Sequence, residues 1–268
     1  MWMINFMNFL QAIIDFRFLT HFDMDGILLV NKPKGPTSFD IIRILRRVTG
    51  ERKIGHTGTL DPEARGLLIV VFGKARKLVE RLQRLDKEYI ARILLGVSTD
   101  TDDISGKVIN REEFPAFSSE IVKKVLTSFK GNIKQQPPRF SAVKVKGQRA
   151  YKLAREGKKF QLKERNVFIH NIDIIYYSHP YLKIVVKCSY GTYIRALARD
   201  IGIKLKTYGT LYSLLRSRIG PWHLTESINV MALKEGKNIQ ERLLPPDVIN
   251  TNFPQIMSSF TYKEVLAL

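Results

Sequence analysis

Residues 55–72 read GHTGTLDPEARGLLIVVF, which joins a loop of glycines and threonines to an uninterrupted apolar run. The run Leu67–Phe72 is typical of a strand that is buried on both faces. In the loop, Gly55 and Gly58 permit a close backbone approach or a positive φ angle. Asp61 ends the loop in an Asp-Pro pair, which by itself indicates only a turn. Because site loops are commonly held by rigid strands, Asp61 is nevertheless a candidate functional residue.

Helices and strands are predicted on both sides of this loop. On the N-terminal side, the apolar run Ile27–Val30 predicts a strand. Thr37 or Ser38 can then cap a helix that ends at Gly50. The remaining predicted elements are a basic helix near 74–85, a strand at 89–95, a helix from Ser118 or Ser119 to Phe129, strands near 165–176 and 181–189, and a helix at about 193–206. This order predicts an α+β fold with a largely antiparallel mixed sheet flanked by helices.

The composition indicates a soluble globular protein with a polyanionic partner. A chain of 268 residues with 44% hydrophobic content can bury the core of one large domain or two modest ones. Lys and Arg outnumber Asp and Glu by 44 to 25, and the formal net charge is +19. Charge alone does not distinguish RNA, DNA and an anionic membrane. The single cysteine, Cys188, cannot form an internal disulfide and is interpreted as a core residue, which fits a reducing cytoplasm.

Positive charge is concentrated in residues 134–165, which we call the basic arm. This segment contains eleven Lys or Arg and two acidic residues, a net charge of +9. A charge run is often only a solvated surface, but the interleaved rings of Phe140, Tyr151 and Phe160 favour contact with a nucleic acid. The candidate contacts to a nucleic-acid backbone are Lys144, Lys146, Arg149 and Lys152.

The N-terminal residues 1–14 are uncharged and apolar, but they lack the features of a secretory signal. No Lys or Arg precedes the run, polar residues interrupt it, and no small-residue cleavage site follows it. The run is also too short to span a bilayer. We expect residues 1–24 to be an extension with no role in the chemistry or a short appended helix, and we expect no membrane partner.

Several motifs together resemble one known family. HTGTLDPEARGLL at residues 56–68 resembles the signature of the TruB family, the bacterial tRNA pseudouridine-55 synthases. Four further motifs resemble that family in the same order along the chain: KPKGPTS at 32–38, DKEY at 86–89, TDTDD at 99–103 and GTYIR at 191–195. Relatives that work with guide RNAs share the aspartate loop, but SAVKVKGQRAYKLAREG at 141–157 is similar to the stand-alone enzymes. The resemblance covers about residues 25–250 and implies the pseudouridine synthase fold.

The resemblance implies that Asp61 begins the isomerisation of uridine 55 in the T loop of tRNA. The reaction breaks the bond between N1 and C1′, turns the uracil and joins C5 to C1′, which requires no cofactor. Asp61 would either attack C1′ or remove the 2′ proton to give a glycal, and the sequence does not separate these routes. Arg195 would pair with Asp61 and keep the carboxylate ionised.

By the same resemblance, Tyr89 stacks on the extruded uracil, and its hydroxyl takes the C5 proton. From spacing alone, Tyr89 would be an ordinary half-buried tyrosine of a strand. His56 would be a wedge that fills the space left by the flipped base. The other substrate contacts that the resemblance implies are Tyr193, Leu215, Lys32 and Asp103. The histidines are scattered without the spacing of metal ligands, so the sequence predicts no metal site.

At the C-terminus the chain departs from the family pattern. Members usually continue into a small PUA domain that contacts the acceptor stem, whereas this chain stops at Leu268. We therefore expect a catalytic domain at 25–250 and, at 251–268, a short remnant of a truncated or missing PUA domain. The expected partner is the T-arm stem-loop of tRNA. We expect a monomer, although the sequence does not decide the oligomeric state. The alternative function is a catalytically idle module that binds or folds tRNA.

Overall fold

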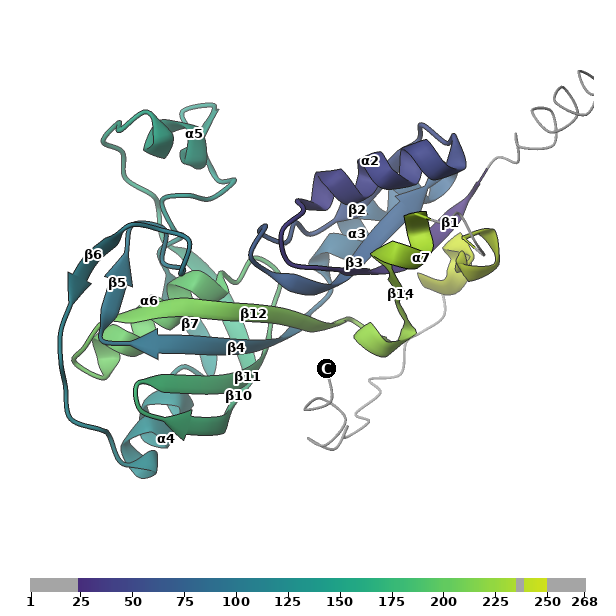
Figure 1. Cartoon of the computed structure of the whole chain (residues 1–268). Helices are drawn as coiled ribbons and strands as arrows, with labels where there is room; N and C mark the ends of the chain where they lie inside the picture. Colours follow the sequence, from purple (N-terminus) through teal and green to yellow (C-terminus); the bar gives the residue numbers. More distant parts are fainter. Residues whose placement is uncertain (1–23, 235–238, 250–268) are drawn as a thin grey trace, which may run out of the picture.

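The computed structural model describes residues 24–234 and 239–249, and the two terminal segments expected to be an extension and a PUA remnant lie outside this range except for Met24. Figure 1 shows the arrangement of the elements. In chain order they are β1 (Gly26–Lys32), α2 (Ser38–Thr49), β2 (Ile54–Thr57), β3 (Arg65–Phe72), the 3-10 helix η1 (Gly73–Leu78), α3 (Val79–Arg84), β4 (Lys87–Leu95), β5 (Val97–Thr99), β6 (Val108–Arg111), α4 (Ser119–Thr127), β7 (Gly131–Gln135), β8 (Lys144–Val145), β9 (Gln148–Arg149), α5 (Ala150–Arg155), β10 (Arg165–Ser178), β11 (Tyr181–Cys188), α6 (Ile194–Lys204), β12 (Gly209–Ile219), β13 (Trp222–His223), η2 (Leu224–Glu226), β14 (Ile228–Asn229), α7 (Val230–Lys234), η3 (Gln240–Arg242) and η4 (Pro246–Ile249).

One ten-stranded sheet runs through the molecule in the order β14-β1-β3-β12-β4-β11-β10-β7, with β2 paired to β3 and β13 paired to β12. All pairs are antiparallel except β1 with β14 and β12 with β3. The prediction of a largely antiparallel mixed sheet is therefore confirmed. Figure 1 shows two halves of the molecule, one that contains α4 and α6 and one that contains α2 and α3. Strands β12 and β4 extend from the first half towards the second.

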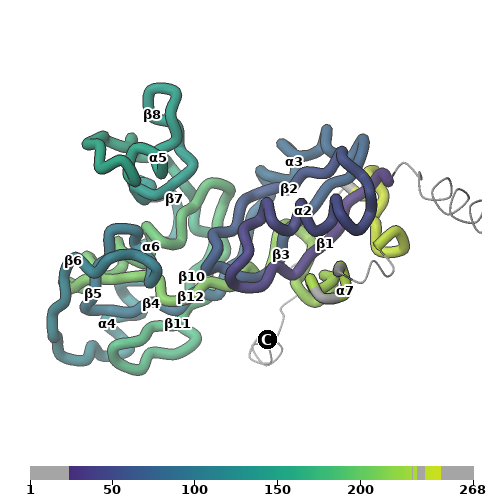
Figure 2. The backbone as a smooth tube through the Cα atoms, turned by 45° about the horizontal axis from the view of Figure 1, so that its top comes forward, coloured from purple at the N-terminus to yellow at the C-terminus, as the bar shows by residue number. Residues whose placement is uncertain are grey.

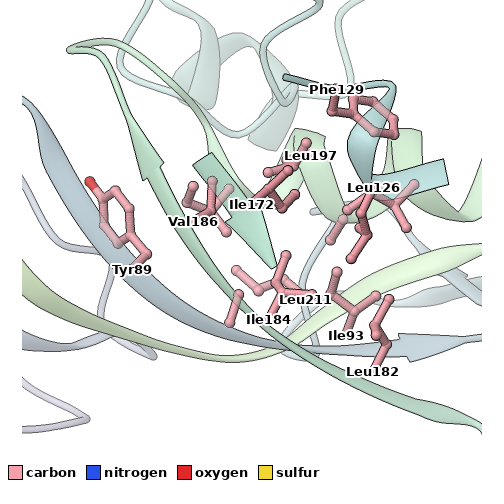
Figure 3. Packing of buried hydrophobic residues seen from close by; sticks show 14 of the residues in the cluster. Tyr89, Ile93, Leu126, Phe129, Ile172, Leu182, Ile184, Val186, Leu197 and Leu211 are labelled. Carbon is pink, nitrogen blue, oxygen red and sulfur yellow. The ribbon is translucent and has the colours of Figure 1, made fainter. Parts of the chain in front are cut away.

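Apolar side chains form three clusters, two on the opposite faces of β1 and β3 and one in the other half. In one half, α2 packs its buried residues Ile41, Ile42 and Leu45 against β1 and β3. In the other, α4 and α6 cover the face of β4 and β11. Figure 3 shows this second core, with Tyr89 at one end and its hydroxyl directed away from the apolar side chains. These clusters are rigid walls on which polar site residues can be held.

The structure confirms most of the predicted elements and their caps. Thr37 is the N-cap of α2 and forms a capping box with Asp40, and Gly50 ends the helix with a φ angle of 72°. Ser118 caps α4. Cys188 is fully buried, as predicted, and burial raises the pKa of its thiol to about 12.

Several strands were not predicted, among them β2, β7 and β12, and one predicted loop is partly wrong. The expected loop at 55–61 begins as a strand, because β2 pairs with the part of β3 that β12 leaves without a partner. Strand β7 at the sheet edge and strand β12 near its middle were also not predicted. In β12 the register shifts twice, which removes the regular alternation of apolar and polar residues that predicts a strand.

The basic arm contains the small hairpin β8–β9 and helix α5, which stand apart from the sheet in Figures 1 and 2. Within residues 24–234 and 239–249, no helix is both long enough and apolar enough to cross a membrane.

Candidate active site

Asp61 lies in the connection between β2 and β3, and the backbone on both sides of it is held. Ser38 at the start of α2 accepts a hydrogen bond from the Leu60 amide at 2.9 Å and donates one to the Leu60 carbonyl at 3.2 Å. On the other side, the Pro62 carbonyl accepts from the Gly35 amide at 2.8 Å. The Asp61 side chain itself remains 45% exposed. The carboxylate is therefore rigidly placed but open to a substrate.

Arg195 binds this carboxylate from the first turn of α6. Its Nε lies 3.0 Å from Oδ2 of Asp61, and its Nη1 lies 3.5 Å from Oδ2 of Asp103. The guanidinium also donates to the carbonyls of Thr101 at 3.1 Å and Phe140 at 3.0 Å. Only 7% of the Arg195 side chain is exposed. All three nitrogens are thus used, so the guanidinium has one fixed orientation against Asp61.

Asp103 contacts a different nitrogen of Arg195 from the one that binds Asp61. Its carboxylate accepts hydrogen bonds from the Thr101 hydroxyl at 2.8 Å and the Ser105 amide at 3.0 Å. The Asp103 side chain is 12% exposed. The structure therefore brings Asp61, Asp103 and Arg195 into one network, in which Asp103 neutralises part of the Arg195 charge.

Gln135 positions the start of α6, a role that the sequence did not predict. Its amide nitrogen donates to the Tyr193 carbonyl at 3.1 Å, and its amide oxygen accepts from the Tyr193 backbone N–H at 2.8 Å. Gln135 is fully buried at the end of β7. Tyr193 is half-buried, with the Arg165 guanidinium 5.4 Å from its ring centroid. The sequence around Gln135 does not indicate this role, because its partner Tyr193 lies 58 residues away in the chain.

Tyr89 meets a second buried arginine, Arg216, which the sequence also did not predict. The two residues pair directly across β12 and β4, and both are buried. Burial raises the pKa of the Tyr89 phenol, and the charge of Arg216 opposes that rise. Leu215, next to Arg216 on β12, is 7% exposed and packs in the core of β1 and β3. The signal for Arg216 was a basic residue in an apolar segment, LLRSRI.

Lys32 and His56 lie in the same region. Lys32 Nζ donates to the carbonyls of Pro33 and Pro36, each at 2.8 Å, and of Pro62 at 3.4 Å. Burial lowers the pKa of Lys32 to about 8, although the charge of Asp61 opposes this. His56 on β2 has a buried Nδ1 without a hydrogen-bond partner. Burial and, to a lesser extent, Arg216 lower the pKa of His56. Lys32 is thus placed to hold the loop of Asp61.

The four candidate contacts of the basic arm are exposed, and they are Lys144, Lys146, Arg149 and Lys152. None of them forms an ion pair with a carboxylate among the described residues. Between the arm and the body lies a cavity of about 550 Å³, whose lining includes Arg139, Phe140 and Phe160. Across residues 24–234 and 239–249, no three side chains of His, Cys, Asp or Glu gather to hold a metal ion.

Comparison with known proteins gives consistent matches. The family model described as TruB family pseudouridylate synthase (N terminal domain) matches residues 46–194. The chain is 41% identical over 233 residues to tRNA pseudouridine synthase B of Clostridium tetani, covering 87% of this chain and 80% of that protein. It is 43% identical over 214 residues to the protein of the same name from Francisella tularensis, covering 80% and 71% respectively. Among solved structures, a Cbf5-Nop10-Gar1 complex matches with a TM-score of 0.64 and 26% identity, covering 84% of this chain and 61% of that chain.

Proposed function

The chain belongs to the TruB family of pseudouridylate synthases and has their fold, and we propose that it converts uridine 55 in the T loop of tRNA to pseudouridine. The curated relatives are named as tRNA enzymes, which supports tRNA as the substrate. The observation that carries the proposal is the ion pair between Asp61 and Arg195 in a half-open site beside Tyr89. From a tRNA substrate we also infer a cytoplasmic location.

Asp61 starts the reaction at the sugar of the flipped nucleotide. Its carboxylate either attacks C1′, which displaces N1 of the uracil, or removes the 2′ proton, which leads to a glycal. The Arg195 contact at 3.0 Å leaves one carboxylate oxygen of Asp61 for the sugar. Asp103 acts through Arg195, because its carboxylate contacts the guanidinium at Nη1.

Tyr89 acts after the uracil has turned and C5 has bonded to C1′. At that stage C5 carries both the sugar and its original proton. When the proton leaves, the C5–H electron pair forms the C5–C6 double bond, and the N1–C6 π pair moves to N1, which takes up a proton. The Tyr89 oxygen is directed away from the apolar core and is the acceptor that we assign to the C5 proton.

The exposed charges of the basic arm hold the T arm by its phosphates. His56 fills the space left in the loop by the flipped base. An idle tRNA-binding module is the alternative, but such a module has no chemical need for a buried arginine that holds a half-exposed aspartate.

The test is conversion of uridine by the purified chain in a tRNA transcript without added cofactor. A matched transcript with cytidine at position 55 is the control. We expect pseudouridine only at position 55 of the first transcript. Tight binding without conversion would support the idle module, and conversion at another position would contradict the assigned site.

A further inference from the structure

Arg216 is a buried cation without an acidic partner. It lies on β12 and is 1% exposed. Among the described residues, no Asp or Glu forms an ion pair with it. Burial of a charge is costly unless hydrogen bonds and nearby charges compensate it. A residue of this kind is therefore expected to have a specific task.

Its hydrogen bonds and its place in the sheet bring it to three parts of the active site. Nε donates to the Leu67 carbonyl of β3 at 2.7 Å, and Nη2 donates to the Gly58 carbonyl at 3.0 Å. These two carbonyls lie on either side of Asp61 in the chain. The third neighbour is Tyr89, the residue that pairs with Arg216 across the sheet. Arg216 thus lies beside both the loop of Asp61 and the residue assigned to the C5 proton.

The backbone geometry at this point requires a glycine. Gly66 of β3 pairs with Arg216 in parallel and has a φ angle of 114°. A Cβ atom at Gly66 would lie 2.4 Å from the Arg216 carbonyl oxygen. Only glycine permits this approach, which brings the Arg216 side chain close enough to the loop of Asp61 to bond it.

A guanidinium only donates hydrogen bonds, so toward Arg216 the Tyr89 oxygen can act only as the acceptor. When Tyr89 takes the C5 proton, its oxygen must carry negative charge beforehand. A permanent cation on the paired residue stabilises that phenolate in a region where burial disfavours it.

We propose that Arg216 is a positioning residue that orients the Tyr89 hydroxyl and stabilises its phenolate for removal of the C5 proton. This inference rests on the proposed function. Arg216 does not touch the reacting atoms and acts only through Tyr89. The carbonyl bonds to Gly58 and Leu67 keep the guanidinium at the oxygen of Tyr89 and not in solvent.

The experiment measures single-turnover conversion of tRNA with hydrogen or deuterium at C5 of uridine 55. For Arg216→Gln we expect the rate to fall by roughly 10- to 100-fold, within the range of proton-transfer contributions. The C5 deuterium isotope effect should increase, because deprotonation becomes slower relative to the earlier steps. A merely structural disturbance of Asp61 would slow an earlier step and would not increase the isotope effect.

Ser217→Ala is the matched control. Ser217 is buried on the same strand and donates to Glu88, next to Tyr89, but it does not touch the Tyr89 hydroxyl. Its isotope effect should equal that of the wild type. In a Tyr89→Phe background, Arg216→Gln should cause a much smaller loss of rate, because its partner is already absent.

Arg216→Met also removes the charge while keeping an unbranched side chain, and the same criterion applies to it if Arg216→Gln does not fold. If the wild type converts uridine 55 and a folded Arg216 variant shows an unchanged isotope effect, the inference is overturned. Absence of conversion by the wild type would instead overturn the proposed function, so the two failures are distinguishable.

Discussion

The active site and the basic arm both depend on positive charge, but they hold it in opposite ways. Arg195 and Arg216 are buried, and each is held by several hydrogen bonds to fixed acceptors. The cations of the arm, apart from the half-buried Arg165, are exposed, and among the described residues only Lys158 forms an ion pair, with Glu156. A fixed cation defines the position of a reacting group, whereas an exposed one exchanges its counterions for phosphates. We therefore expect substitutions in the first set to change kcat and those in the second to change binding.

The largest effect is expected for Asp61→Asn. The amide keeps the shape of the side chain but can act neither as a nucleophile nor as a base, so conversion of uridine should be abolished. Binding of tRNA should stay within a few-fold of the wild type, as measured by filter binding. Turnover by this variant, after deamidation has been excluded by mass spectrometry, would contradict the assignment of Asp61.

Arg195→Met should lower kcat by roughly 100-fold or more with little change in tRNA affinity, because it removes the group that orients Asp61. The matched control is Arg199→Met on the same helix, since Arg199 has its own ion pairs with Asp102 and Asp200. Single-turnover rates at saturating enzyme separate catalysis from binding. An equal loss in both variants would indicate a general disturbance of α6 and not a specific role for Arg195.

Neutralising the arm should affect binding and leave chemistry nearly intact. With the four arm residues changed to Gln, the slope of log K against log salt should flatten by roughly one unit for each lost phosphate contact. The variant carries Lys144→Gln, Lys146→Gln, Arg149→Gln and Lys152→Gln. Lys123→Gln with Lys124→Gln, on the exposed face of α4, is the control for charge alone. Equal flattening per charge in both variants would identify the arm as an ordinary solvated surface.

The smallest effect concerns Lys32, a buried cation whose hydrogen bonds end on carbonyls of its own loop region. Its pKa is about 8 in the folded protein and 10.5 when unperturbed, so between these values the unfolded chain binds more protons. The wild type should gain stability relative to Lys32→Met as the pH rises through this window, and the difference should be constant below it. Urea unfolding of both proteins at several pH values measures this. A difference that does not change between pH 8 and 10 would contradict the lowered pKa.

The site could be predicted from the sequence where its residues lie in local motifs. The loop of Asp61, the cap of α2 and the start of α6 near Arg195 are encoded by neighbouring residues, and they agree with the structure. Arg216 and Gln135 could not be predicted, because their partners Gly58 and Tyr193 are brought to them only by the sheet. Patterns of apolar and polar residues count every arginine as polar, so they predict that Arg216 is exposed although the fold buries it.

The position of β12 in the sheet has a consequence for the order of assembly. This strand is made after all the other long strands, yet it lies between β3 and β4. During synthesis, β3 and β4 are therefore complete long before the strand that joins them exists. Arg216 must be inserted between them before Gly58, Leu67 and Tyr89 are connected. Because such long-range pairing is slow, a nascent chain acquires a catalytic centre only after Ile219 has left the ribosome and closed the sheet.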